Sequence, residues 1–199
     1  MWTLPNILTL LRIALIPIFV ASFYLPWEWR HLATAAIFGV AAATDWLDGY
    51  LARKLNQFTP FGAFLDPVAD KLIVAAALIV LVQVHATALF ALPAIVIISR
   101  EIVISALREW MAELGNRTSV AVSYVGKVKT TLQMVAIAVL LAVDPVLHPV
   151  WDQVGIVLLY IAAILTLWSM VIYLRAAWPE LSRVPNQEDS SEDIGKGDD

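Results

Sequence analysis

The chain alternates between long apolar segments and short polar connections. A membrane span needs about 20 mostly apolar residues, and six segments approach or exceed this length. We expect one helix in each segment, over residues 8–25, 32–54, 60–82, 86–111, 125–143 and 151–174. The pattern therefore predicts an all-α integral membrane protein with six transmembrane helices and no room for a second folded domain.

Composition supports this fold class and separates one terminal segment from it. Hydrophobic residues make up 60% of the chain, whereas soluble domains contain about half. There is no cysteine, which excludes thiolate catalysis, thiolate metal sites and disulfides. Six of the 17 acidic residues lie within the last 12 positions. We therefore divide the chain into a membrane-embedded catalytic domain (1–178) and an acidic, disordered cytoplasmic tail (179–199).

The placement of lysine and arginine predicts the orientation of the spans. Cytoplasmic connections of membrane proteins carry an excess of these residues. Of the connections that we expect on the other side, only one carries a basic residue, Arg30. We therefore expect both termini and the two basic connections in the cytoplasm. The basic residues on that side are Arg53, Lys54, Arg108, Arg117, Lys127, Lys129, Arg175 and Arg183.

Four aspartates gather around the connection between the second and third segments. Asp45 and Asp48 lie about 60° apart on one helix, at about 100° per residue. Asp66 and Asp70 lie one turn apart on the next helix, which we expect to begin with Thr59 as its N-cap and Pro60 as its first residue. Because the connection is short, the two helices are antiparallel neighbours and the four carboxylates converge.

Converging carboxylates repel one another unless cations lie between them. Oxygen ligands of this kind suit Mg²⁺ or Mn²⁺, and four carboxylates can hold two ions, as in enzymes that displace phosphoryl groups. The small residues Gly49, Ala52 and Gly62 leave space for a bulky ligand, and Arg53 can pair with a phosphate. The alternative, in which the acids only pair with nearby basic residues, explains neither the clustering nor the small residues.

Residues 45–70 read D-x₂-D-G-x₂-A-R-x₈-G-x₃-D-x₃-D, and this motif resembles the complete signature of the CDP-alcohol phosphatidyltransferase family. Residues 99–114 read SREIVISALREWMAEL and residues 118–133 read TSVAVSYVGKVKTTLQ. These segments, with Pro5, Asn6, Leu8, Thr9 and Arg12, resemble the bacterial phosphatidylglycerophosphate synthase branch of the family. The resemblance implies a homodimer in the bacterial cytoplasmic membrane, with a divalent-metal site that faces the cytoplasm.

The resemblance also assigns roles to residues of the motif. Asp45, Asp48, Asp66 and Asp70 would be the metal ligands, and Asp70 would also be the general base. The residues implied to contact the cytidine diphosphate are Gly49, Ala52, Arg53 and Gly62.

Basic residues further along the chain supply a second anion site. A phosphorylated acceptor such as glycerol 3-phosphate would need one, and the candidates are Arg100, Arg108, Lys127 and Lys129. Arg100 follows a long apolar run, so we expect it to point into the bundle. Lys129 has an alternative role, in which it extends to lipid headgroups.

Two further groups of polar residues have open or minor roles. Asn6, Thr9 and Arg12 recur every three residues, and they either line the site or lie along the membrane interface. The histidines, His31, His85 and His148, fall in or beside connections away from the aspartates, so we expect them to be solvent-exposed.

The sequence thus predicts a membrane enzyme that transfers a phosphatidyl group from CDP-diacylglycerol to glycerol 3-phosphate, giving phosphatidylglycerophosphate and CMP. One alternative keeps the chemistry but uses another acceptor, namely phosphatidylglycerol, inositol phosphate or serine. The remote alternative is a cation or proton transporter, which would place its acids near the bilayer midplane rather than at one end of the helices.

Overall fold

The structure, a computed structural model, describes residues 3–55, 59–113 and 124–181, and these ranges contain six α-helices and no strand. The predicted number and order of helices are confirmed. Helix α1 begins earlier than expected because Pro5 occupies its first turn, where a missing N–H group costs nothing. The helices are α1 (Leu4–Tyr24), α2 (Arg30–Leu55), α3 (Pro60–His85), α4 (Ala88–Glu113), α5 (Tyr124–Ala142) and α6 (Pro149–Leu181).

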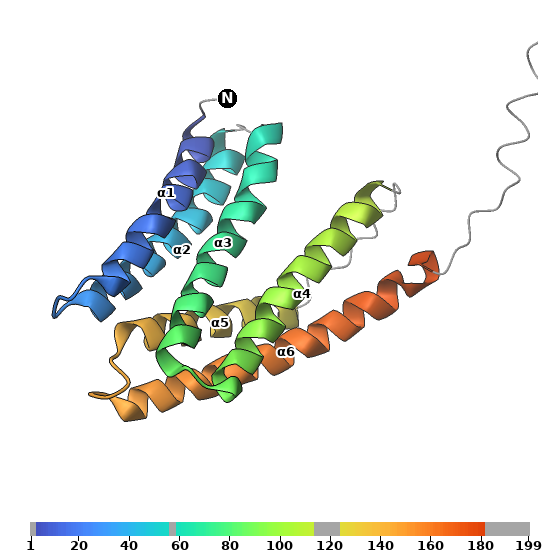
Figure 1. The fold of residues 1–199 in the computed structure, drawn as a ribbon. Helices are drawn as coiled ribbons and strands as arrows, with labels where there is room; N and C mark the ends of the chain where they lie inside the picture. Colours follow the sequence, from blue (N-terminus) through green and yellow to red (C-terminus); the bar gives the residue numbers. More distant parts are fainter. Residues whose placement is uncertain (1–2, 56–58, 114–123, 182–199) are drawn as a thin grey trace, which may run out of the picture.

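The helices form two groups that share a core. Helix α1 packs against both α2 and α3, while α5 packs along α6 and also contacts α2 and α3. Figure 1 shows α1, α2 and α3 side by side, with α5 and α6 crossing them near one end. Helix α4 follows α3 and leans on α6. This arrangement places α2, α3, α4 and α5 around a common interior.

Close contacts between helices depend on small and apolar side chains. The largest fully buried apolar residues come from all six described helices. Gly155 brings α6 against α5, because a Cβ atom built there would lie 2.6 Å from Cγ of Leu140. The core residues of this kind are Phe19, Phe38, Leu78, Leu81, Ile97, Ile137, Leu141 and Leu159.

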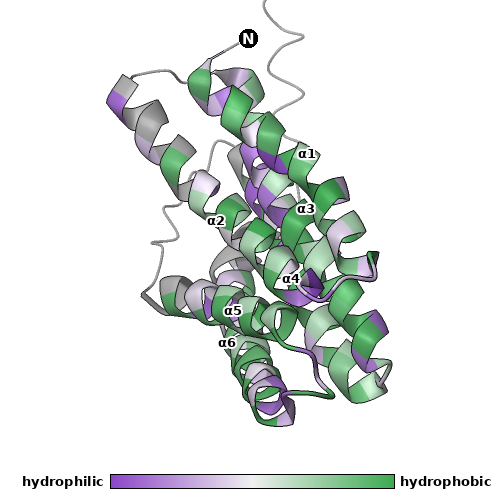
Figure 2. Cartoon of the chain, turned by 90° about the vertical axis from the view of Figure 1, so that its left-hand side faces the viewer, coloured by the Kyte–Doolittle hydropathy of each residue, from purple (hydrophilic) through white to green (hydrophobic). Residues whose placement is uncertain are grey.

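The outer surface is apolar, as expected for a protein that faces lipid. Large aliphatic side chains project outward, among them Ile79, Ile95 and Ile164, each more than half exposed. Figure 2 shows hydrophobic residues along most of the helices. Soluble monomers rarely expose apolar surface on this scale. Among the residues that the structure describes, four helices are long and apolar enough to cross a membrane, and Val128–Ala142 is a shorter apolar helix. The four are Leu4–Tyr24, Pro60–His85, Ala88–Met111 and Pro149–Arg175.

The all-α membrane fold is therefore confirmed, whereas the number of spans and the orientation stay predictions. Helix α2, which carries Asp45, is not among the four helices that meet the length and hydropathy requirements. Helix α6 runs to Leu181, slightly past the expected start of the acidic tail. Residues 182–199 lie outside the described part of the chain, so the expected disorder of the tail also stays a prediction.

A hydrogen-bonded pair joins α3 to α6 at the end of α3 away from the motif aspartates. Nε2 of His85 lies 2.9 Å from Oδ1 of Asp152, and the His85 ring stacks on Phe90 with centroids 4.0 Å apart. His85 is in the last turn of α3 and Asp152 in the first turn of α6, so the pair ties together the ends of these two helices. The His85 side chain is only 10% exposed, and its expected solvent exposure was wrong.

A second polar cluster holds the connection between α5 and α6. Asp144 accepts a hydrogen bond from the backbone N–H of Val146 at 2.9 Å, which lowers the pKa of Asp144. The same carboxylate lies 3.6 Å from Arg30 and 3.5 Å from His31, at the start of α2. The His31 side chain is largely buried, against expectation, whereas His148 is exposed. Sequence reasoning missed these partners of Asp144.

We expect His85→Ala to lower the free energy of unfolding by about 1–3 kcal/mol, because Asp152 loses its partner in a poorly hydrated setting. Thermal unfolding of the purified protein in detergent measures this effect. His148→Ala removes an exposed histidine and is the matched control. Equal unfolding temperatures for the two variants would contradict the assigned role of the pair.

Candidate active site

Asn6, Thr9 and Arg12 form a polar stripe on α1 that points into the bundle. Two of these residues contact Asp45, Asp66 and Asp70, and we call these three aspartates with Arg12 the acidic cluster. The Thr9 hydroxyl donates to Oδ1 of Asp66 at 2.5 Å. Nη1 of Arg12 donates to Oδ1 of Asp45 at 3.1 Å and also to Oδ1 of Asp70. Helix α1 therefore holds carboxylates that come from two different helices, α2 and α3.

Arg12 is the most deeply buried charge of this cluster. Its side chain is fully buried, whereas the side chains of Asp45 and Asp70 are 46% exposed. A guanidinium inside an apolar bundle is costly unless it is paired, and here it bridges two carboxylates. Asn6 and Thr9 are buried as well, so the stripe faces the interior and does not lie along the membrane interface.

Asn6 fixes the start of α3 and explains why residue 62 is a glycine. Thr59 caps the helix, as predicted, by accepting the N–H of Gly62 at 3.0 Å. The Asn6 amide donates to the Thr59 hydroxyl at 2.9 Å. A Cβ atom at position 62 would overlap Oδ1 of Asn6. Gly62 is thus needed for the close approach of α1 and α3, and its predicted contact with the donor nucleotide stays a prediction.

Several predicted site residues lie outside the described side chains. Their backbones belong to α2 or to the first turn of α5. These residues are Asp48, Gly49, Ala52, Arg53 and Lys127.

A second cluster, of opposite charge, lies between α4, α5 and α6. We call its described cations, Arg100, Arg108 and Lys129, the basic cluster. Arg100 and Lys129 are 6% and 4% exposed, as the apolar run before Arg100 predicts. Oε1 of Glu101 lies 2.7 Å from Nη1 of Arg100 and 3.6 Å from Nζ of Lys129. Nη2 of Arg100 also donates to the Ser169 hydroxyl at 3.2 Å. The burial of Lys129 shows that its alternative role, extension to lipid headgroups, was wrong.

Tyr173 of α6 orients the third described cation of this cluster. Nη2 of Arg108 donates to the Tyr173 hydroxyl at 3.0 Å. The Tyr173 ring also lies 5.3 Å from the guanidinium of Arg108 and 5.9 Å from that of Arg100, within the range of cation–π attraction. Sequence reasoning missed Ser169 and Tyr173. Their spacing of four residues on an otherwise apolar helix was the available signal, because it puts them on one face.

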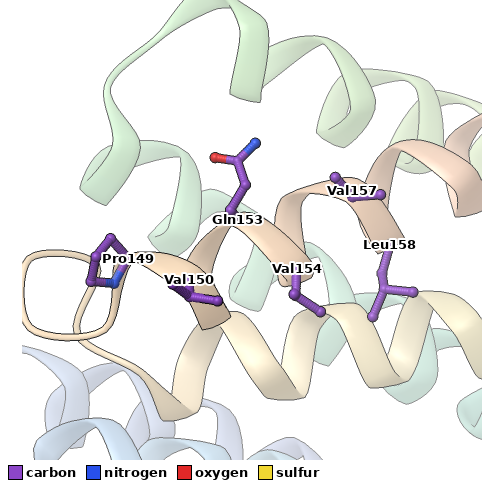
Figure 3. A pocket seen from close by; sticks show the side chains of 6 residues that line it. All are labelled: Pro149, Val150, Gln153, Val154, Val157 and Leu158. Atoms are coloured by element: carbon purple, nitrogen blue, oxygen red, sulfur yellow. The ribbon is translucent and has the colours of Figure 1, made fainter.

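One cavity joins the acidic and basic clusters. Its volume is about 640 Å³, and its lining includes Asp45 and Asp70 together with Arg100, Arg108 and Lys129. Another hollow, of about 600 Å³, runs along the start of α6. Figure 3 shows that Gln153 is the only polar one of the six residues that line it. The charged cavity alone, of these two, offers ligands for metals and phosphates.

The acidic cluster has the donor chemistry of a site for a hard divalent cation. Asp45, Asp66 and Asp70 supply carboxylate oxygens, which such cations prefer. Within the described side chains, no three acidic or histidine groups come close enough to form a complete metal site. Asp48, one helical turn after Asp45, is the remaining predicted ligand and is not among them.

Comparison with known proteins identifies the family of the chain. Residues 2–168 match the family model for CDP-alcohol phosphatidyltransferases. The chain belongs to the CDP-alcohol phosphatidyltransferase family. The match covers α1 to most of α6, so it includes Asp45, Asp66 and Asp70 as well as Arg100, Arg108 and Lys129. The predicted family, and with it the assignment of the chain as a transferase, is confirmed.

Individual members of the family are similar over nearly the whole chain. The chain is 58% identical to a CDP-diacylglycerol–glycerol-3-phosphate 3-phosphatidyltransferase from Pseudomonas fluorescens, over 89% of this chain and 91% of the relative. It is 57% identical to the proteins of that name from Escherichia coli (strain K12) and Shigella flexneri serotype 5b, over 90% of this chain and 97% of each relative.

The contacts of Arg12 generate a prediction for this transferase. Replacing groups that hold metal ligands typically costs 10- to 100-fold in metal affinity or activity. We expect Arg12→Gln to lower the rate of phosphatidyl transfer by about this factor, because Asp45 and Asp70 would repel each other across the gap. Arg12→Lys keeps the positive charge but lacks the planar guanidinium that can contact two carboxylates. Its rate of phosphatidyl transfer should lie between those of the wild type and Arg12→Gln.

Rates at a series of Mg²⁺ concentrations measure this effect. Arg175→Gln removes an exposed arginine of α6 and is the control for the loss of one positive charge. A wild-type rate and Mg²⁺ dependence for folded Arg12→Gln would show that Arg12 does not position the carboxylates.

Proposed function

We propose that this chain transfers the phosphatidyl group of CDP-diacylglycerol to the primary hydroxyl of glycerol 3-phosphate, which yields phosphatidylglycerophosphate and CMP. The observation that carries this proposal is the cavity that Asp45 and Asp70 line together with Arg100, Arg108 and Lys129. Such a cavity can hold a phosphorylated alcohol with its phosphate at the cations and its hydroxyl at a carboxylate. The names of the similar proteins agree with this acceptor.

The CDP-alcohol phosphatidyltransferase family generally depends on a divalent metal. In our proposal Mg²⁺ or Mn²⁺ is bound as a pair of ions by Asp45, Asp48, Asp66 and Asp70. The ions neutralise the diphosphate of the donor when they are bound. The contribution of the chain is to bring four carboxylates from α2 and α3 together, with Thr9 and Arg12 fixing the orientation of three of them.

Residues beside the aspartates would bind the donor. Gly49, Ala52 and Gly62 leave room for the cytidine diphosphate, and Arg53 pairs with a phosphate. The acyl chains of the donor stay in the bilayer, so the site needs a lateral opening between helices.

Asp70 is the proposed general base. It lines the cavity and its Oδ1 is held by Arg12. The primary hydroxyl of the acceptor loses its proton to Asp70 while its oxygen attacks the phosphorus nearer the diacylglycerol. The bond from that phosphorus to the oxygen bridging to the cytidine phosphate breaks, and CMP leaves with the electron pair.

The basic cluster would bind the phosphate of the acceptor. Arg100 and Lys129 are buried, so water and salt screen their charges less than those of surface residues. Arg108 and Lys127 complete the proposed phosphate site. A phosphorylated acceptor uses these charges and serine does not, which favours glycerol 3-phosphate over that alternative.

The remaining features of the proposal concern the setting of the enzyme. Six spans with both termini in the cytoplasm place the acidic cluster and the start of α3 on the cytoplasmic side of a bacterial inner membrane. The protein would act as a homodimer. The transporter alternative has no support, because the aspartates share their cavity with cations suited to phosphate.

Incubation of the purified protein with labelled glycerol 3-phosphate, CDP-diacylglycerol and Mg²⁺ tests the proposed reaction. We expect CMP and labelled phosphatidylglycerophosphate in equal amounts, with turnover lost in chelator and restored by added metal. Asp70→Asn should nearly abolish turnover while the protein stays folded, because the amide cannot accept the proton. CMP release that does not depend on glycerol 3-phosphate would refute the acceptor, and full activity of Asp70→Asn would refute the base.

A further inference from the structure

A single carboxylate oxygen of Glu101 lies between the two buried cations of the basic cluster. Oε1 is 2.7 Å from Nη1 of Arg100 and 3.6 Å from Nζ of Lys129, and Glu101 lines the same cavity as both. An oxygen of a phosphate bound to Arg100 and Lys129 together would need the position that Oε1 holds. A carboxylate and a phosphate monoester thus compete for one place.

The cations are fixed, whereas the carboxylate is free to leave. The side chains of Arg100 and Lys129 are 7% and 5% exposed, and Arg100 is also held by Ser169. The Glu101 side chain is 32% exposed, so it can turn toward water without a change in the surrounding helices. Displacement would therefore move Glu101 and leave the cations in place.

The charges of the described cluster match a particular ligand. Arg100, Arg108 and Lys129 contribute three positive charges and Glu101 one negative charge. When Glu101 has turned away, the three cations face the phosphate monoester, which carries two negative charges when it is fully ionised. With Glu101 in place, the empty cluster also has less excess charge to attract unrelated anions.

We propose that Glu101 is a displaceable internal counter-ion of the acceptor site, and that the phosphate of the acceptor takes its place between Arg100 and Lys129. This inference rests on the proposed use of a phosphorylated acceptor. Inorganic phosphate and the phosphate of glycerol 3-phosphate both displace Glu101, and both gain the contacts with the cations. Glycerol 3-phosphate also places its hydroxyl at Asp70, so it binds more tightly than inorganic phosphate.

Inhibition by inorganic phosphate tests the role of Glu101. Initial rates are measured in neutral detergent with CDP-diacylglycerol as the only phospholipid, while glycerol 3-phosphate and inorganic phosphate are varied. Glu101→Gln removes the competing charge and keeps the shape of the side chain. We expect the inhibition constant of inorganic phosphate to fall by about tenfold, with a similar fall in KM for glycerol 3-phosphate, because both phosphates displace the same carboxylate. Thermal stabilisation of the variant by inorganic phosphate should increase in parallel, and this readout needs no turnover.

Glu109→Gln is the matched control, since Glu109 is an exposed residue of the same helix and does not line the cavity. Its constants should equal those of the wild type. If Glu101 merely holds the cations in place, Glu101→Gln will raise both the inhibition constant and KM or fail to fold, and the inference is overturned. Unchanged constants would overturn it as well. A wild-type enzyme whose CMP release ignores glycerol 3-phosphate would instead refute the proposed function, so the two failures are distinguishable.

Discussion

The structure depends on one ionic contact, in which the buried guanidinium of Arg12 bridges Asp45 and Asp70. These carboxylates come from different helices and would repel each other at close range. A membrane-embedded arginine is in turn tolerated only with partners of opposite charge. Through Arg12 and Thr9, helix α1 therefore sets the positions of acidic residues on α2 and α3.

The second half of the chain contains a similar bridge with the charges reversed. Two buried cations, Arg100 on α4 and Lys129 on α5, are bridged by the carboxylate of Glu101. Ser169 and Tyr173 of helix α6 contact Arg100 and help to hold it in place. Each cluster contains one internal counter-charge, and each borders the same cavity. A donor and an acceptor that both carry phosphate can thus meet there, because one cluster suits metal ions and the other suits a phosphate.

The sequence predicted the helices well because apolar length and the Thr59-Pro60 start are local signals. It also predicted the burial of Arg100, since a charged side chain within a long apolar run is expected to point into the bundle and away from lipid. It did not predict which partners meet across helices. The contact of Arg12 with both aspartates, the role of Gly62 against Asn6, and the pair of His85 with Asp152 all depend on packing between segments far apart in the chain. The support that α6 gives to the cations was missed for the same reason.

The central claim is that aspartates of α2 and α3 form one metal site in which the reaction takes place. A crystal structure of the protein with Mn²⁺ and CDP-diacylglycerol, solved with anomalous scattering from manganese, tests it most directly. The account predicts two manganese peaks among Asp45, Asp48, Asp66 and Asp70, with the diphosphate of the donor beside them and the cavity lined by Arg100 and Lys129 open to the same phosphorus. Manganese bound elsewhere, or a donor bound away from these aspartates, would contradict it.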